Sequence, residues 1–138
     1  MFYTVPPEQP EIVGYQNGSV VRVSDKLVTL NLTCHSRAGK PAATLKWLRN
    51  GVELSADDAE VTYWTVQSIN VGGGGKLQDS VSMLSFTASD DDNGAYYTCA
   101  AQNEALQRPY RVTVQLGVLR EFNNIIVSSA LMLRSVQG

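Results

Sequence analysis

Apolar and polar residues alternate along several short stretches of the chain, which is typical of β-strands that bury one face. In the clearest stretch, 28–34, every second residue is apolar: Val28, Leu30, Leu32 and Cys34. The residues between them are polar, so we expect Leu32 in a core and Asn31 on the solvent side. The pattern repeats over 43–48, where Leu45 and Trp47 fall on the apolar side.

Five further stretches are rich in β-branched and aromatic residues and are predicted to be strands: 19–23, 61–66, 81–86, 97–101 and 110–116. We expect the first of these at a sheet edge and Leu84 in the core. Turn signals separate the strands: Asn50-Gly51 predicts a two-residue hairpin, and the four glycines at 72–75 predict a flexible hairpin tip. No stretch has a convincing helical period, so the spacing predicts an all-β sandwich or barrel.

Two cysteines, a tryptophan and a tyrosine indicate the kind of sandwich. Cys34 lies in one predicted strand, Trp47 thirteen residues later in the next, and Tyr97 two residues before Cys99. Two cysteines alone could also be free thiols in a cytosolic core, but this order on strands is that of an immunoglobulin-like Greek-key β-sandwich. We therefore expect an inter-sheet Cys34–Cys99 disulfide, Trp47 packed on it, and the Tyr97 hydroxyl bonded back to the corner upstream. Such a bridge implies an oxidising compartment.

Several segments resemble the second immunoglobulin domain of the nephrin and Kin-of-IRRE family of adhesion proteins. The most specific is Lys-Pro-Ala-Ala-Thr at 40–44, just before Trp47. Segment 5–8 is similar to that family's linker between its first and second domains, so the resemblance covers 5–117. The other matching segments are 31–34, 49–51, 92–99 and 102–105.

The resemblance implies a C2-like set domain in a multi-domain, single-pass receptor, on the extracellular side of the plasma membrane. It implies that the partners are other immunoglobulin-superfamily cell-surface proteins, bound homophilically or heterophilically. In that family a second domain serves largely as a rigid spacer in cell–cell adhesion. The alternative is a stand-alone secreted immune-type ligand, because no membrane span is visible in the sequence.

We expect one immunoglobulin-like domain at 10–117, a proline-rich linker at 1–9 and a tail of uncertain structure at 118–138. No signal peptide is visible at the start, which predicts a piece of a longer protein or a missing start. The tail lacks the prolines and edge strand with which the resembled family begins its next domain. Its apolar run, 125–133, has nine residues, whereas a membrane-spanning helix needs about 20.

Composition and charge narrow the function further. Apolar residues make up 43% of the chain, enough for a core, and the net charge is −2. Nucleic acid and anionic membranes attract basic proteins, so neither is predicted as the main partner.

His35, the single histidine, is expected to face solvent, so we predict no catalytic residue, cofactor or small-molecule substrate. The acidic run 90–92 lacks the spacing of a calcium site and is expected to be a solvated turn without metal.

Several exposed positions are candidates for modification or contact. Asn17 and Asn31 begin Asn-x-Ser/Thr sequons and are expected to carry N-glycans. Aromatic and arginine side chains often anchor interfaces, which makes four residues candidates here: Tyr63, Trp64, Tyr110 and Arg49. The alternatives are packing on the sandwich for Trp64 and a solvated charge for Arg49.

The segment before Cys99 departs from the common pattern of these domains. The usual Asp-x-Gly-x-Tyr-x-Cys motif is offset by one residue, so that Asn93 stands where aspartate is expected. The offset therefore argues against the buried Arg–Asp bridge that variable-type domains contain.

Overall fold

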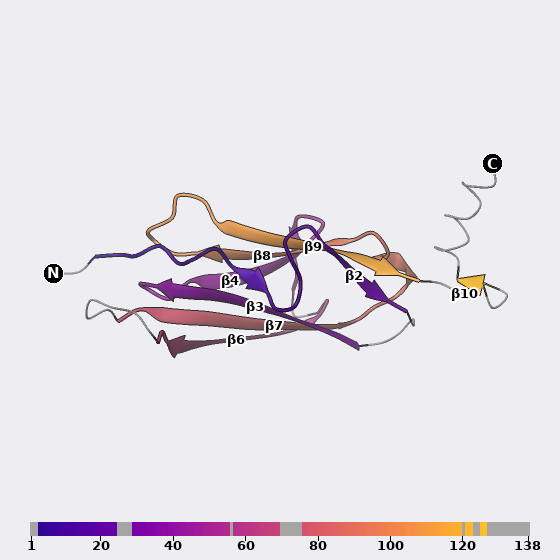
Figure 1. Cartoon of the computed structure of the whole chain (residues 1–138), viewed down its shortest axis with the longest axis horizontal. Coiled ribbons are helices and arrows are strands. Elements are labelled where there is room, and N and C mark those ends of the chain that lie inside the picture. The colour runs from indigo at the N-terminus through magenta and orange to yellow at the C-terminus, as the bar shows by residue number, and fades with distance from the viewer. Residues whose placement is uncertain are drawn as a thin grey trace.

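The computed structural model of the chain describes residues 3–24, 29–55, 57–69, 76–119, 121–122 and 125–126. Two β-sheets pack face to face in it, as Figure 1 shows, with β9, β8 and β4 in one layer and β3, β7 and β6 in the other. This confirms the predicted all-β immunoglobulin-like sandwich. The predicted glycine-rich tip at 72–75 lies outside the described residues, as does most of the tail.

The four-stranded sheet has the order β1-β3-β7-β6 and is antiparallel throughout. Its strands are β1 (Glu11–Ile12), β3 (Thr29–Gly39), β7 (Gln78–Thr87) and β6 (Glu60–Gln67). The five-stranded sheet has the order β2-β9-β8-β4-β5, with β2 parallel to β9. Its strands are β2 (Val20–Val23), β9 (Tyr110–Val118), β8 (Tyr96–Gln102), β4 (Thr44–Arg49) and β5 (Val52–Glu53). Two short strands, β10 (Glu121–Phe122) and β11 (Ile125–Ile126), pair with each other.

The strands and the hairpin follow the sequence pattern closely. Stretch 19–23 contains the edge strand β2, and the β4–β5 hairpin turns at Asn50 and Gly51, whose φ angles are 51° and 85°. A left-handed backbone at both positions is what a type I′ turn requires, which explains the Asn-Gly pair. The strand that contains Cys34 is longer than predicted and continues to Gly39 past an irregularity in its pairing with β7.

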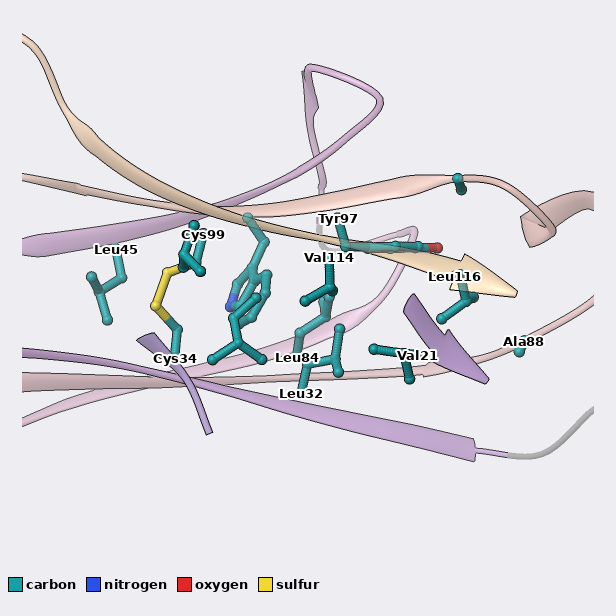
Figure 2. Close-up of a cluster of buried hydrophobic side chains, with 14 of the residues drawn as sticks. Val21, Leu32, Cys34, Leu45, Leu84, Ala88, Tyr97, Cys99, Val114 and Leu116 are labelled. Atoms are coloured by element: carbon teal, nitrogen blue, oxygen red, sulfur yellow. A yellow bond between two sulfur atoms is a disulfide. The ribbon is translucent and has the colours of Figure 1, made fainter. Parts of the chain in front are cut away.

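The core lies between the sheets, and the predicted Cys34–Cys99 disulfide is present and joins them (Figure 2). Trp47 and Tyr97 are each 2% exposed. Leu32 and Leu84, from the centre of the four-stranded sheet, lie in the same cluster. These residues come from β3, β4, β7 and β8, so the cluster joins the middle strands of both sheets.

The proline-rich segment 5–9, which the sequence assigns to a linker, is hydrogen-bonded to the domain. Val5 and Lys40 exchange two backbone hydrogen bonds, of 2.8 and 3.0 Å. The buried amide of Asn103 donates to Val5 O at 2.8 Å and to Pro41 O at 3.0 Å. Glu8 N donates to Arg37 O at 2.8 Å. The direction in which the chain enters the sandwich is therefore fixed.

The last strand of the five-stranded sheet ends on the opposite side of the sandwich. Strand β9 ends at Val118, and Leu119 N still donates to Val23 O at 2.9 Å. Residues 3–10 and the end of β9 lie at opposite ends of the sandwich (Figure 1). Within the described ranges, no helix has the length and hydropathy needed to cross a membrane.

Candidate protein-binding surface

Asp92, Tyr97 and Arg49 meet where the chain turns into β8, a cluster that we call the Tyr97 corner. Asp92 Oδ1 accepts from the Tyr97 hydroxyl at 2.9 Å and from Arg49 Nε at 3.2 Å. Asp92 Oδ2 accepts from Ser89 N at 2.9 Å. The Tyr97 hydroxyl thus bonds back upstream, as expected, onto a carboxylate.

The structure corrects two expectations at this corner. The acidic run was expected to be a solvated turn, but it forms the 3-10 helix η1 (Asp90–Asp92) and Asp92 is buried. An Arg–Asp bridge was expected to be absent, but Arg49 and Asp92 form one. Both predictions are wrong because Asp92, one residue before the expected position, reaches the arginine. Asn93 instead accepts a hydrogen bond from Val118 N at 2.9 Å.

Burial and the neighbouring carboxylate change the acid–base behaviour of Tyr97. Loss of solvent around the hydroxyl, and then its hydrogen bond to Asp92, raise the pKa of Tyr97 to about 12. The Tyr97 hydroxyl has the largest effect on the pKa of Arg49 and raises it; burial opposes this rise, and Asp92 adds to it, so that the pKa lies above its usual value. The arginine therefore stays charged, and it holds the corner together. Of the four candidate interface residues, Arg49 is the one committed to this internal contact.

Tyr63 and Trp64 are consecutive residues of β6, the outermost strand of the four-stranded sheet, so their side chains point to opposite faces of that strand. All eight residues of β6, which we call the β6 edge, are exposed. Four large apolar side chains contribute to it: Val61 (43% exposed), Tyr63 (45%), Trp64 (42%) and Val66 (45%). Because Trp64 is this exposed, packing against the sandwich does not account for a tryptophan at this position. The exposure of Val61 and Val66 could not be predicted, because apolar residues occur at both odd and even positions of the strand.

The β6 edge is tied firmly to the rest of the domain. The Tyr63 hydroxyl donates to Ala43 O at 2.6 Å, across to the segment that precedes β4. The Trp47 indole N–H donates to Ser82 Oγ at 2.9 Å, and that hydroxyl donates to Thr62 O at 2.7 Å. These bonds link the core tryptophan to the backbone of the exposed strand. The edge is therefore a rigid surface.

The remaining candidates lie elsewhere on the molecule. Tyr110 begins β9 in the other sheet and is 36% exposed, so it does not belong to the β6 edge. Tyr96, at the start of β8, is 51% exposed and was not singled out from the sequence. Its exposure could have been predicted from the sequence, because side chains alternate along a strand and the next residue, Tyr97, was expected in the core.

Both sequon asparagines are exposed. The side-chain oxygen of Asn31 accepts from the Ser85 hydroxyl, and that of Asn17 accepts from Thr113 N at 2.8 Å. Neither bond uses the amide nitrogen to which a glycan is attached, so both sites are compatible with modification. Glycosylation itself stays a prediction.

His35 lies on the outer face of the four-stranded sheet, between two carboxylates. Its Nε2 is 3.6 Å from Asp79 Oδ2 and its Nδ1 is 4.0 Å from Glu11 Oε1. Asp79 also accepts from Ala38 N at 2.9 Å, which helps to hold the irregular end of β3. This is a cross-strand contact between β1, β3 and β7. In the part of the chain that the structure describes, no group of histidine, cysteine or acidic residues is arranged to hold a metal ion.

The sequence model of the CD80-like C2-set immunoglobulin domain matches residues 15–110, most of the sandwich. The chain belongs to this family. Human Kin of IRRE-like protein 3 is 34% identical to this C2-set domain over 116 residues, which are 83% of the chain and 13% of the relative. Rat cell adhesion molecule 3 is 33% identical over 109 residues, 79% of the chain and 24% of the relative. The expected resemblance to the Kin-of-IRRE family is thereby confirmed.

Solved structures agree with the sequence relatives. The crystal structure of Rst D1-D2 matches with a TM-score of 0.70 and 25% identity, over 83% of this chain and 50% of that one. The ectodomain of mouse nectin-like molecule 4 (Ig1–Ig3) matches with a TM-score of 0.59 and 25% identity, over 84% of this chain and 35% of that one. The C2-set domain thus spans a quarter or less of the length of the two named sequence relatives.

Proposed function

We propose that this C2-set domain is an extracellular part of a longer cell-surface receptor for adhesion and recognition. The observation that carries the proposal is the similarity, over 83% of the chain, to Kin of IRRE-like proteins, together with the match to a protein named for cell adhesion. The disulfide agrees with an oxidising, extracellular environment. The same relatives support a binding role rather than an enzymatic one.

The partners that we propose are other immunoglobulin-superfamily proteins at cell surfaces. Large aromatic side chains that are rigidly held are typical anchors of protein interfaces. Tyr63 meets this description, because its hydroxyl is bonded to Ala43 O. Trp64 follows it on a strand whose backbone is fixed at Thr62 by the Ser82 hydroxyl. The β6 edge is therefore the surface that we expect to touch other proteins first.

A spacer role is supported by the two ends of the sandwich. Segment 5–9 is fixed by the Val5–Lys40 pair and by Asn103, and it lies opposite the end of β9. A domain with fixed entry at one end and exit at the other would hold neighbouring domains apart along one line. This arrangement fits the second position in a receptor, between an outer recognition domain and those nearer a membrane anchor.

A binding assay tests the adhesion proposal. The intact chain, coupled to beads at high density, is screened against a panel of immunoglobulin-superfamily ectodomains that includes the chain itself. An unrelated disulfide-bonded immunoglobulin domain on matched beads is the control. We expect selective capture of one or a few ectodomains. Failure to capture any of them above the control, under this multivalent presentation, would overturn the binding role.

A second assay addresses the spacer role in the complete receptor. Replacing the domain by a Gly/Ser linker of the same length should weaken receptor-driven bead aggregation, because a flexible linker no longer fixes the distance between neighbouring domains. Unchanged aggregation and partner choice would contradict the spacer role. A stand-alone secreted ligand, the alternative function, predicts that the 138-residue chain alone reproduces the full activity of the protein.

A further inference from the structure

The β6 edge differs from the other sheet edges in this domain. Strands β1 and β5 have two residues each and β2 has four, whereas β6 has eight and pairs with β7 residue by residue along its whole length. Proteins usually protect a long edge strand with lysine, proline, a bulge or a covering segment, because its unpaired backbone can bind another strand. Strand β6 has neither proline nor lysine, and its single charged residue, Glu60, stands at its start. Its edge is therefore suited to strand addition.

The hydrogen-bonding direction of β6 shows which residues point outward. Ser68 N donates to Leu77 O at 2.9 Å, and these two residues continue the β6–β7 register. In an antiparallel ladder, hydrogen-bonded pairs alternate with non-bonded pairs. The even-numbered residues of β6 therefore bond to β7. The backbone N–H and C=O groups directed to the open edge belong to Val61, Tyr63, Thr65 and Gln67.

We propose that two copies of this chain pair through their β6 edges in an antiparallel, two-fold arrangement with Trp64 opposite Trp64. The two four-stranded sheets then form one continuous sheet. In this register the outward backbone of Tyr63 in one copy bonds to that of Thr65 in the other. Thr62 lies opposite Val66 of the second copy.

The sequence of β6 favours a second copy as the occupant. With Trp64 opposite Trp64, Tyr63 faces the β-branched Thr65 and Thr62 faces Val66, so the strand offers a copy of itself the aromatic and β-branched cross-strand pairs that stabilise antiparallel sheets. In the proposed register Glu60 lies opposite the polar Ser68, so no like charges meet. The neighbouring two-fold register, centred on Tyr63, would place the Glu60 carboxylate opposite Val66. Charge and polarity therefore favour the register centred on Trp64 over the one centred on Tyr63.

The exposed area predicts a weak pairing. Each copy offers four apolar side chains that are 42–45% exposed, which corresponds to roughly 300 Å² for side chains of this size. A stable complex buries about 800 Å² per partner, so the pairing needs high local concentration. Confinement of many copies to one surface supplies such a concentration. The pairing rests on the strand alone, and only its use at a cell surface rests on the proposed function.

A matched pair of substitutions at residue 65 tests the pairing. Thr65→Pro removes an outward N–H that β7 does not use, and proline is tolerated at such edge positions. Thr65→Val keeps that N–H and changes only the side chain. Sedimentation velocity of the full chain, up to high micromolar concentration, should show a monomer–dimer equilibrium for the wild type and Thr65→Val. Thr65→Pro should weaken the dimer by at least about tenfold, since two intermolecular hydrogen bonds are lost per dimer.

A second pair keeps the test independent of proline effects on folding. Trp64→Lys should abolish the dimer, whereas Val52→Lys, at a 70% exposed position on β5, should leave it intact. A wild-type chain that stays monomeric, or a dimer that survives both Thr65→Pro and Trp64→Lys, would overturn the proposal. Bead capture of a different ectodomain by Thr65→Pro, unchanged from wild type, would show that the proposed function stands without this pairing.

Discussion

The disulfide-linked centre and the β6 edge are built from similar residues but have opposite surroundings. In the centre, Trp47 is 2% exposed and Cys34, Leu84 and Cys99 are fully buried. On the edge, Trp64 is 42% exposed, although it also lies in a regular strand. The difference comes from position, since β4, β8, β3 and β7 have neighbours on both sides and β6 has one.

This contrast indicates a division of roles within one small domain. Burial of apolar surface and the inter-sheet disulfide stabilise the centre, so changes there should lower the free energy of unfolding. The edge contributes little burial and leaves backbone groups free, so changes there should affect contacts with other molecules. The predictions below test the division, in order of decreasing effect.

Removing the disulfide should have the largest effect. The bridge joins residues separated by 65 positions, and closing a loop of that length stabilises the folded state by about 4 kcal/mol. The double variant Cys34→Ala/Cys99→Ala should therefore lose about that much unfolding free energy in urea. Trp64→Lys serves as the matched edge variant and should lose less than about 0.5 kcal/mol. An equal loss in the two variants would break the distinction between centre and edge.

Asp92→Ala should be the next most harmful change. The buried carboxylate accepts from Tyr97, Arg49 and Ser89, and its removal leaves these donors without their partner. We expect a loss of about 3 kcal/mol, measured by urea unfolding. Asp91→Ala, at the exposed neighbouring position, is the control and should be nearly neutral. If both variants lost the same small amount, the Tyr97 corner would not be part of the stable centre.

Tyr97→Phe should cost about 1–2 kcal/mol, because Asp92 loses one of its donors. It should also change the pH dependence of stability. The pKa of Tyr97 is raised to about 12 in the folded state, from about 10 in the unfolded chain. Below pH 10 the hydroxyl is protonated in both states, so its contribution is complete; as the pH rises from 10 to 12 that contribution is lost. Between those pH values the wild type should therefore lose unfolding free energy more steeply than Tyr97→Phe, and parallel curves would contradict the assignment.

Tyr63→Phe should cost about 1 kcal/mol, less than the three changes above, because one hydrogen bond to Ala43 O is lost. This variant tests the edge specifically, because the lost bond joins the β6 edge to the segment before β4. Hydrogen exchange in β6 should accelerate while exchange in β8 stays unchanged. Faster exchange in β8 as well would mean that edge and centre unfold as one unit.

The sequence predicted the centre of this domain much better than its surface. Alternation gave strand 28–34, and the order Cys34, Trp47, Tyr97 and Cys99 gave the sandwich and its bridge, because these features depend on local period and spacing. The Asn50-Gly51 hairpin followed from the backbone conformation that the pair allows.

The failures have a common physical reason. Asp92 was expected in solvent because its burial depends on Arg49 and Tyr97, which approach it only in the folded sandwich. The unpaired edge of β6 depends on the order of strands in the sheet. The residues of β6 do not themselves show that it pairs with one strand instead of two. The hydrogen bonds that Val5 makes to Lys40 and Asn103 could not be predicted either, because they join distant parts of the chain.

Residue-resolved amide hydrogen exchange of the wild-type chain, at low and high protein concentration, tests the central contrast most directly. At both concentrations the amides of Leu84 and Cys99 should be the most strongly protected. The outward amides of β6, at 61, 63, 65 and 67, should exchange rapidly at low concentration and become protected at high concentration. Equal protection of the edge and the centre at low concentration, or outward amides that stay unprotected at high concentration, would contradict the account.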